Sequence, residues 1–361
     1  MVAPVTLVHD ESGVVDSSVV VVAHAGSRRP VEPGPRRAGS PGTVVAAILL
    51  AGVTAVLAAR WWTGAAVQPA LAGLPDAGAL TRFGLPIAQY LHEVGGVAVV
   101  GVLFVQCLAA RGSGLGHRHM AEMVVRWGWL WVVATAVWMV LTLSDMAGVP
   151  VTSLVSDPGL LFLMLGTTRV LAVTSTLWVA ILVVMFARRA SGLTGTAVLC
   201  AVATAGLLPA ALTGHAGHHN TSVVAATTTL GVHIVAATLW VGGLLALIVH
   251  VRRFPDMLRE VLPRFSFAAL VCVVAVGISG LVASVLMLDG WAQLWGSSRG
   301  QLILVKTVAL VALAAFGARH RMRTVGAASS GRLLPLLRLG AAELALMGAT
   351  IGIAVVLSTT A

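Results

Sequence analysis

Long apolar runs, separated by short polar or arginine-rich stretches, repeat along the chain from about residue 43 to its end. A helix that spans a bilayer needs roughly 20 mainly apolar residues. Nine runs reach about this length: 43–61, 85–109, 127–146, 163–187, 194–213, 223–249, 265–288, 301–318 and 334–357. The pattern therefore predicts an all-α fold, a polytopic membrane helical bundle of nine transmembrane helices.

Residues 1–42 have a different character, because Pro, Gly and Arg occur there without a helical period. They also lack an apolar stretch followed by a cleavage site, which a secretory signal would show. We expect a disordered cytoplasmic tail; the alternative is that the true start of the protein lies further along. The rest of the chain agrees with a membrane protein, since only 10% of all residues are charged, against about 25% in a typical soluble domain.

Basic side chains concentrate in alternate segments between the runs. Of the 23 Lys and Arg residues, 18 lie in one set of segments, 3 in the other, and two within runs. The larger set is Arg28, Arg29, Arg36, Arg37, Arg111, Arg118, Arg126, Arg188, Arg189, Arg252, Arg253, Arg259, Arg264, Arg319, Arg321, Arg323, Arg332 and Arg338. Because cytoplasmic loops are enriched in Lys and Arg, we expect a cytoplasmic N-terminus and an external C-terminus. The net charge of +10 then reflects topology, and no nucleic-acid partner is expected.

The chain shows signs of an internal repeat. Aligning His92 with His233 also aligns Gly101 with Gly242, at an offset of 141 residues. Later helices keep nearly the same offset: Arg126 precedes Arg264 by 138 residues, and Arg169 precedes Lys306 by 137. We therefore expect a tandem repeat of a four-helix unit, formed by helices 2–5 and 6–9, with both copies pointing the same way. The predicted divisions are 1–42 (tail), 43–222 (helices 1–5) and 223–361 (helices 6–9).

Several ionisable residues lie inside the runs, where they are costly and usually functional or paired. For Glu93, Arg169, Lys306 and Glu343 we favour a structural role, as two ion pairs, Glu93–Arg169 and Lys306–Glu343. The histidines His92 and His233 lie at matching places in the two predicted copies. They indicate either a shared metal site or two imidazoles that each bond a backbone carbonyl.

A histidine cluster, "GHAGHHN", lies between helices 5 and 6, on the predicted outer face. Its members are His215, His218 and His219, and glycines between them allow the backbone to fold around an ion. Met146 and Met287 are near the same face, as is Met164. Imidazole combined with thioether suits copper better than zinc. The cluster therefore predicts copper capture; the alternatives are a solvated polar loop and methionines that only fill space.

Four segments of helices 6–9 resemble the copper resistance protein D (CopD) family. They are "HIVAATLWVGGLLAL" (233–247), "RFSFAALVCVVAVGISGLVAS" (264–284), "GQLILVKTVALVALAAFGARHR" (300–321) and the ending "AAELALMGATIGIAVVLSTTA". The residues that fall on the family's pattern are His233, Trp240, Gly242, Gly243, Lys306 and Glu343. Trp240 and the two glycines are expected to pack helices together.

The resemblance implies a protein of the bacterial inner membrane, not an enzyme, that moves copper inward from the periplasm. It also implies a separate soluble CopC-like donor of copper, because no such domain is fused to this chain. No phosphate-binding loop for ATP is present. The alternatives are a haem b electron-transfer protein with His92 and His233 as axial ligands, and a copper-binding assembly or sensing partner without flux.

Overall fold

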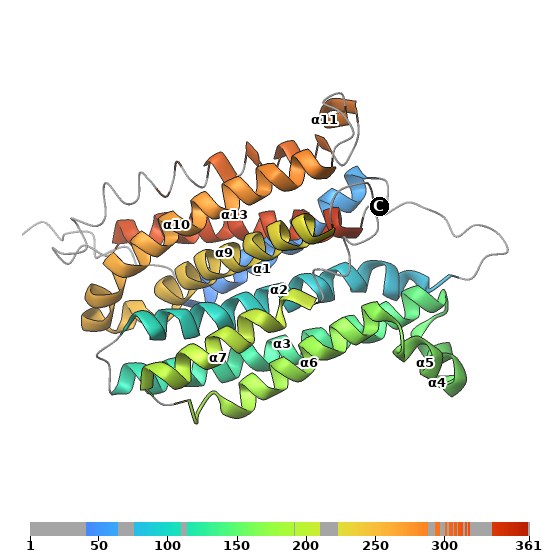
Figure 1. Cartoon of the computed structure of the whole chain (residues 1–361), viewed down its shortest axis with the longest axis horizontal. Helices are drawn as coiled ribbons and strands as arrows, with labels where there is room; N and C mark the ends of the chain where they lie inside the picture. Colours follow the sequence, from blue (N-terminus) through green and yellow to red (C-terminus); the bar gives the residue numbers. More distant parts are fainter. Residues whose placement is uncertain are drawn as a thin grey trace, which may run out of the picture. The chain divides into compact units, whose positions relative to one another are not determined.

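The computed structural model describes residues 41–63, 76–109, 114–190, 192–209, 223–287, 293–296, parts of 300–317, and 334–359. Every regular element in these ranges is a helix (Figure 1). The long helices are α1 (Pro41–Trp62), α2 (Gly78–Leu108), α3 (Leu115–Ala147), α6 (Thr168–Phe186), α7 (Gly192–Gly206), α9 (Val223–Val249), α10 (Pro255–Met287) and α13 (Leu334–Thr359). The short ones are α4 (Val151–Ser156), α5 (Pro158–Leu165), the 3₁₀ turn η1 (Val251–Arg253) and α11 (Gln293–Gly296).

Seven of the described helices are long and apolar enough to cross a membrane. The run predicted at 194–213 is represented by the shorter helix α7, and the run predicted at 301–318 is only partly described. The multi-pass helical fold is therefore established, and the count of nine spans stays a prediction.

Several of the predicted runs have different bounds in the structure; α2 and α10, for example, begin at Gly78 and Pro255, before the runs predicted at 85–109 and 265–288. Helix α3 begins at Leu115, twelve residues before the predicted run, because its first turns carry His, Arg and Glu side chains that an apolar run excludes. Helix α6 begins only at Thr168, because the apolar residues before it form α4 and α5 instead. Asp157 separates these two short helices and caps α5, accepting a hydrogen bond from the Leu160 backbone N–H at 3.0 Å.

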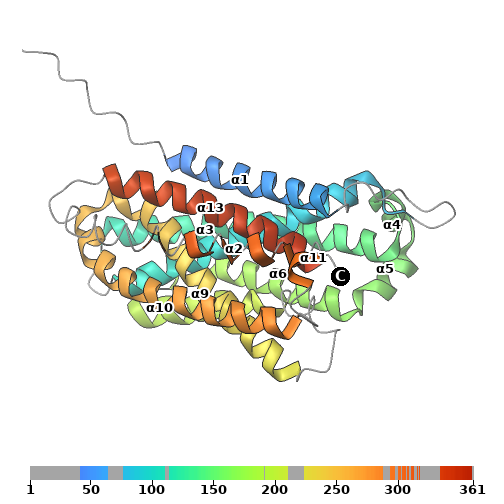
Figure 2. The ribbon, with the colours of Figure 1, turned by 90° about the horizontal axis from the view of Figure 1, so that it is seen from above.

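Helix α2 is the central helix of the bundle. It packs against α3, α7 and α9, and more lightly against α1, α10 and α13. All of its residues from Val94 to Leu103 are buried, as expected of a helix that is apolar on every side. Figure 1 shows α2 between α9 and α1 on one side and α3 and α7 on the other, and Figure 2 shows α1 beside α13.

The backbones of α2 and α9 touch at two glycines. A Cβ atom added to Gly101 would overlap the backbone of Gly242, and one added to Gly242 would overlap the Val97 carbonyl oxygen. Small residues permit such direct contact between helices in a membrane. Gly101 and Gly242 are also the positions that match in the predicted repeat, and contact between matched positions is what a two-fold relation would produce. The repeat itself stays a prediction.

Glycines also bring α1 and α13 together. A Cβ at Gly348 would lie 2.9 Å from the Ile48 carbonyl oxygen, and one at Gly352 would lie 2.5 Å from that of Gly52. The Tyr90 hydroxyl of α2 donates a hydrogen bond of 2.9 Å to the same Ile48 carbonyl. The first and last long helices are thus fixed to each other and to α2.

Trp240 and Gly243, also on α9, take part in its packing. Trp240 is buried in the main apolar cluster. A Cβ at Gly243 would overlap the Phe265 ring of α10. Gly242 and Gly243 therefore allow close packing of α9 against two different helices, α2 and α10.

The Gly101 contact leads to a stability prediction. Gly101→Ala should lower the free energy of unfolding by about 1–3 kcal/mol, because the two backbones must separate. Gly277→Ala is the matched control, since a Cβ there meets nothing within 4 Å. Thermal unfolding of the purified protein in detergent measures both, and equal stability of the two variants would contradict the packing described here.

Candidate functional site

The histidines of the predicted outer cluster, His215, His218 and His219, lie outside the described residues, as does the intramembrane residue Lys306. Met287 ends α10, but its side chain is outside them as well. Met146 lies at the end of α3 with an exposed side chain, and Met164 lies in α5.

His92 is held in an aromatic enclosure between α2 and α3. Its side chain is almost completely buried, with an exposed fraction of 1%. The ring centroid lies 4.7 Å from that of Trp138 and 6.3 Å from that of Trp131. Its Nδ1 atom is 2.8 Å from the Thr135 hydroxyl oxygen. One helix, α3, thus provides all three contacts.

The hydroxyl group of Thr135 determines which nitrogen of His92 carries the proton. Its single hydrogen is donated to the Trp131 carbonyl oxygen at 2.6 Å. The hydroxyl oxygen must then accept a hydrogen bond from Nδ1–H of His92. The neutral ring consequently carries its lone pair on Nε2, the atom through which an imidazole can bind a metal ion.

His233 is arranged in the same way between α9 and α10. Its Nδ1 atom is 3.0 Å from the Ser279 hydroxyl oxygen. Ser279 in turn donates to the Ala275 carbonyl oxygen at 2.6 Å. The hydroxyl again accepts from Nδ1–H, and the lone pair again lies on Nε2. His233 is half-buried, and its ring lies close to Gly280.

Both histidines thus show the support that metal-binding imidazoles usually have, a second nitrogen that donates to a fixed oxygen. Their contacts, however, lie on different helices, α3 for His92 and α10 for His233. Each histidine precedes its contact glycine by nine residues. Nine residues at 3.6 per turn make two and a half turns, so each histidine points away from the α2–α9 contact. The geometry favours two separate histidine positions over a shared one.

The predicted ion pair between Glu93 and Arg169 requires correction. Neither Glu93 nor Arg169, both described residues, forms an ion pair within 4.0 Å, whereas Arg82–Asp76, Arg259–Asp256 and Arg264–Glu260 do. Arg169 is in the first turn of α6, whereas Glu93 lies about 22 Å along α2. The sequence estimate placed them at equal depth because it started α6 too early and α2 too late.

Glu343 is buried in α13. A Cβ added to Gly317 would lie 3.6 Å from its carboxylate oxygen Oε1. Its predicted partner, Lys306, lies outside the described residues, so this ion pair stays a prediction.

A histidine pair that the sequence did not single out lies at the opposite end of the bundle. The rings of His119 (α3) and His250 (after α9) are 5.8 Å apart, and His119 is 5.5 Å from Phe254. The Trp127 Nε1–H donates to Nε2 of His250 at 3.0 Å. This bond occupies the lone pair of His250 and gives the ring a packing role. The two histidines are distant in sequence, so only helix packing reveals them.

In the described part of the chain, no three His, Cys, Asp or Glu side chains are grouped closely enough to hold a metal ion. The structure instead shows two single imidazoles, His92 and His233, and each is oriented by a hydroxyl group on the next long helix. Such isolated ligands are the kind that an ion can bind and leave again.

Comparison with protein families covers both parts of the bundle. Residues 79–225 match the copper resistance protein D-like N-terminal domain, and residues 259–357 match copper resistance protein D. The first match spans α2 to α7, and the second spans most of α10 and α13. No curated protein and no solved structure matches the chain. With both of its domains matched, the chain belongs to the copper resistance protein D family of multi-pass membrane proteins.

Proposed function

We propose that this protein carries copper across the membrane, from the outer face to the cytoplasm, with His233 as the principal ligand within the bilayer. The observation that carries the proposal is the orientation of His233 by Ser279, which leaves the lone pair on Nε2. Family membership indicates that the metal is copper, because copper resistance requires a protein that handles copper. The recurrence of the arrangement at His92 and Thr135 supports the proposal independently.

His233 suits a transit ligand better than His92 does. It is half-buried and lies against Gly280, which has no side chain to obstruct the ring. His92 is enclosed by two tryptophans and is 1% exposed. An ion can reach His92 only if one of these large rings moves. We therefore assign His92 a secondary role, as a second ligand or as a structural counterpart of His233.

Copper entry is proposed at the loop that carries His215, His218 and His219. This loop directly precedes α9, the helix of His233. Met146 and Met287 end helices on the same predicted face and would add thioether ligands. We expect a soluble CopC-like protein to deliver the ion there. The ion would then move inward along α9 by about 15 Å to reach His233.

Copper flux tests the route. In vesicles containing purified protein, His233→Ala and the triple change His215→Ala, His218→Ala, His219→Ala should each lower copper uptake by at least about 10-fold, because each removes a ligand. His117→Ala is the control, since Gln106 bonds the backbone carbonyl of His117 and not its ring. Uptake at the unaltered rate by both altered proteins would rule the route out, and copper binding without any flux would favour an assembly or sensing role.

The hydroxyl groups can be tested separately from the histidines. Ser279→Ala should weaken copper binding about 10-fold or more, because His233 then loses the partner that fixes its tautomer. Ser279→Thr, which keeps a hydroxyl, should retain most of the affinity. Competition with a chromogenic copper chelator measures this, and equal losses in the two variants would indicate a packing effect instead.

Absorption spectroscopy distinguishes copper transport from haem-based electron transfer. One haem would need His92 and His233 to face each other, but they face α3 and α10. We expect no Soret band in the protein purified from cells supplied with haem precursor. A Soret band that disappears in His92→Ala and in His233→Ala would establish the haem alternative.

A further inference from the structure

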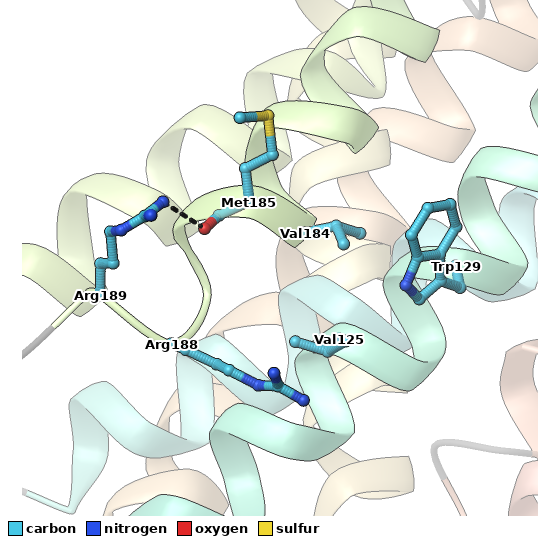
Figure 3. A pocket seen from close by; sticks show the side chains of 6 residues that line it. All are labelled: Val125, Trp129, Val184, Met185, Arg188 and Arg189. Carbon is cyan, nitrogen blue, oxygen red and sulfur yellow. Dashed lines mark hydrogen bonds between the residues drawn. The ribbon is translucent and has the colours of Figure 1, made fainter.

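A pocket lies on the surface of the bundle between α3 and α6, away from both histidine positions. Its volume is about 400 Å³, and its lining consists of Val125, Trp129, Val184, Met185, Arg188 and Arg189 (Figure 3). Four of these side chains are apolar or aromatic and two are cationic. Copper transport as proposed above uses none of them.

The pocket is built where α3 and α6 approach closely. A Cβ on Gly128 would lie 2.6 Å from Cγ2 of Val184, so the missing side chain lets α6 lie against α3. Trp129, the next residue of α3, is 55% exposed. Met185 of α6 is exposed to a similar degree, 54%. The apolar wall of the pocket therefore faces the surroundings of the bundle.

The two arginines follow directly after the apolar part of α6. This helix has 19 residues, Thr168–Phe186, and is therefore about 28 Å long, close to the thickness of the hydrocarbon core. Arg188 and Arg189 then lie at the level of the lipid headgroups. Trp129 lies at the same end of the bundle and supports this headgroup level, since tryptophan is enriched at membrane–water interfaces.

The guanidinium groups lie on opposite sides of the chain at the end of α6 (Figure 3). Arg189 donates to the Met185 carbonyl oxygen at 3.2 Å, and its guanidinium lies 5.9 Å from the centroid of the Phe186 ring. Arg188 extends towards Val125 on α3. Neither arginine belongs to the ion pairs formed among the described residues. Two adjacent cations without an acidic partner there favour an anionic ligand.

We propose that this pocket binds an anionic phospholipid, with its phosphate at Arg188 and an acyl chain along Trp129, Val184 and Met185, while Arg189 adds positive charge on the other side of the chain. The planar guanidinium of a single arginine binds phosphate through two parallel hydrogen bonds, and basic pockets between membrane helices bind lipid headgroups. The exposed apolar wall identifies the source of the phosphate, because a free phosphate ion gains nothing from contact with tryptophan and methionine.

Native mass spectrometry of the full chain in detergent tests the proposal, with phosphatidylglycerol and phosphatidylcholine as probes. The double change Arg188→Gln, Arg189→Gln should weaken retention of phosphatidylglycerol roughly 10- to 30-fold, with little effect on phosphatidylcholine. The matched control is Arg252→Gln, Arg253→Gln, a second adjacent pair that follows an apolar helix. Trp129→Ala should also weaken retention, through loss of the apolar wall.

Three results would overturn the proposal. The first is unchanged retention of phosphatidylglycerol by the Arg188 and Arg189 double variant. The second is an equal loss in the Arg252 and Arg253 control, which would indicate a diffuse attraction to basic residues. The third is complete displacement of the lipid by millimolar inorganic phosphate with no effect of Trp129→Ala, which would identify a site for free phosphate. Size-exclusion profiles confirm that each variant is folded, and Trp129→Ala tests the pocket without altering charge.

Discussion

The backbone contact between Gly101 and Gly242 determines how the rest of the bundle is arranged. It joins α2 and α9, the two most deeply buried of the described candidate spans, at a separation that any side chain would prevent. Because the contact occupies one face of each helix, the opposite faces must find other partners. Those faces carry His92 and His233, and the partners are α3 and α10. A single close approach thus separates the two histidines and assigns each to its own neighbouring helix.

In the described part of the bundle, several buried polar groups are satisfied by hydroxyl and carbonyl oxygens. Thr135 and Ser279 each link a histidine to a backbone oxygen, and Thr176 of α6 donates to the Gly206 carbonyl of α7 at 2.8 Å. Such hydrogen bonds cost less free energy in lipid than an ion pair does, because an ion pair must offset the loss of hydration of both ions. The predicted pair of Glu93 and Arg169 is not formed, because α2 begins earlier and α6 begins later than the apolar runs indicated.

The sequence predicted the membrane class and the family, because both depend on local features such as run length and motif. The role of the histidines as ligands stays a prediction. The sequence did not predict helix bounds such as Leu115 and Thr168. Polar turns extend α3 back to Leu115, and the apolar residues before Thr168 form a separate short helix. Nor did the sequence identify Thr135 and Ser279 as partners, because nothing local distinguishes them from other hydroxyl residues. The histidine loop at 215–219 and Lys306 lie outside the described residues, so the predictions for them stand as made.

The two histidine positions differ in one respect that bears on transport. Thr135 and Ser279 are 144 residues apart, and the same offset matches Trp131 with Ala275 and Trp138 with Val282. At this offset, the tryptophans that enclose His92 correspond to the smaller residues alanine and valine. On the proposed copper route, His233 is therefore the less enclosed of the two imidazoles, and it lies on α9, the helix that directly follows residues 215–219 in the sequence.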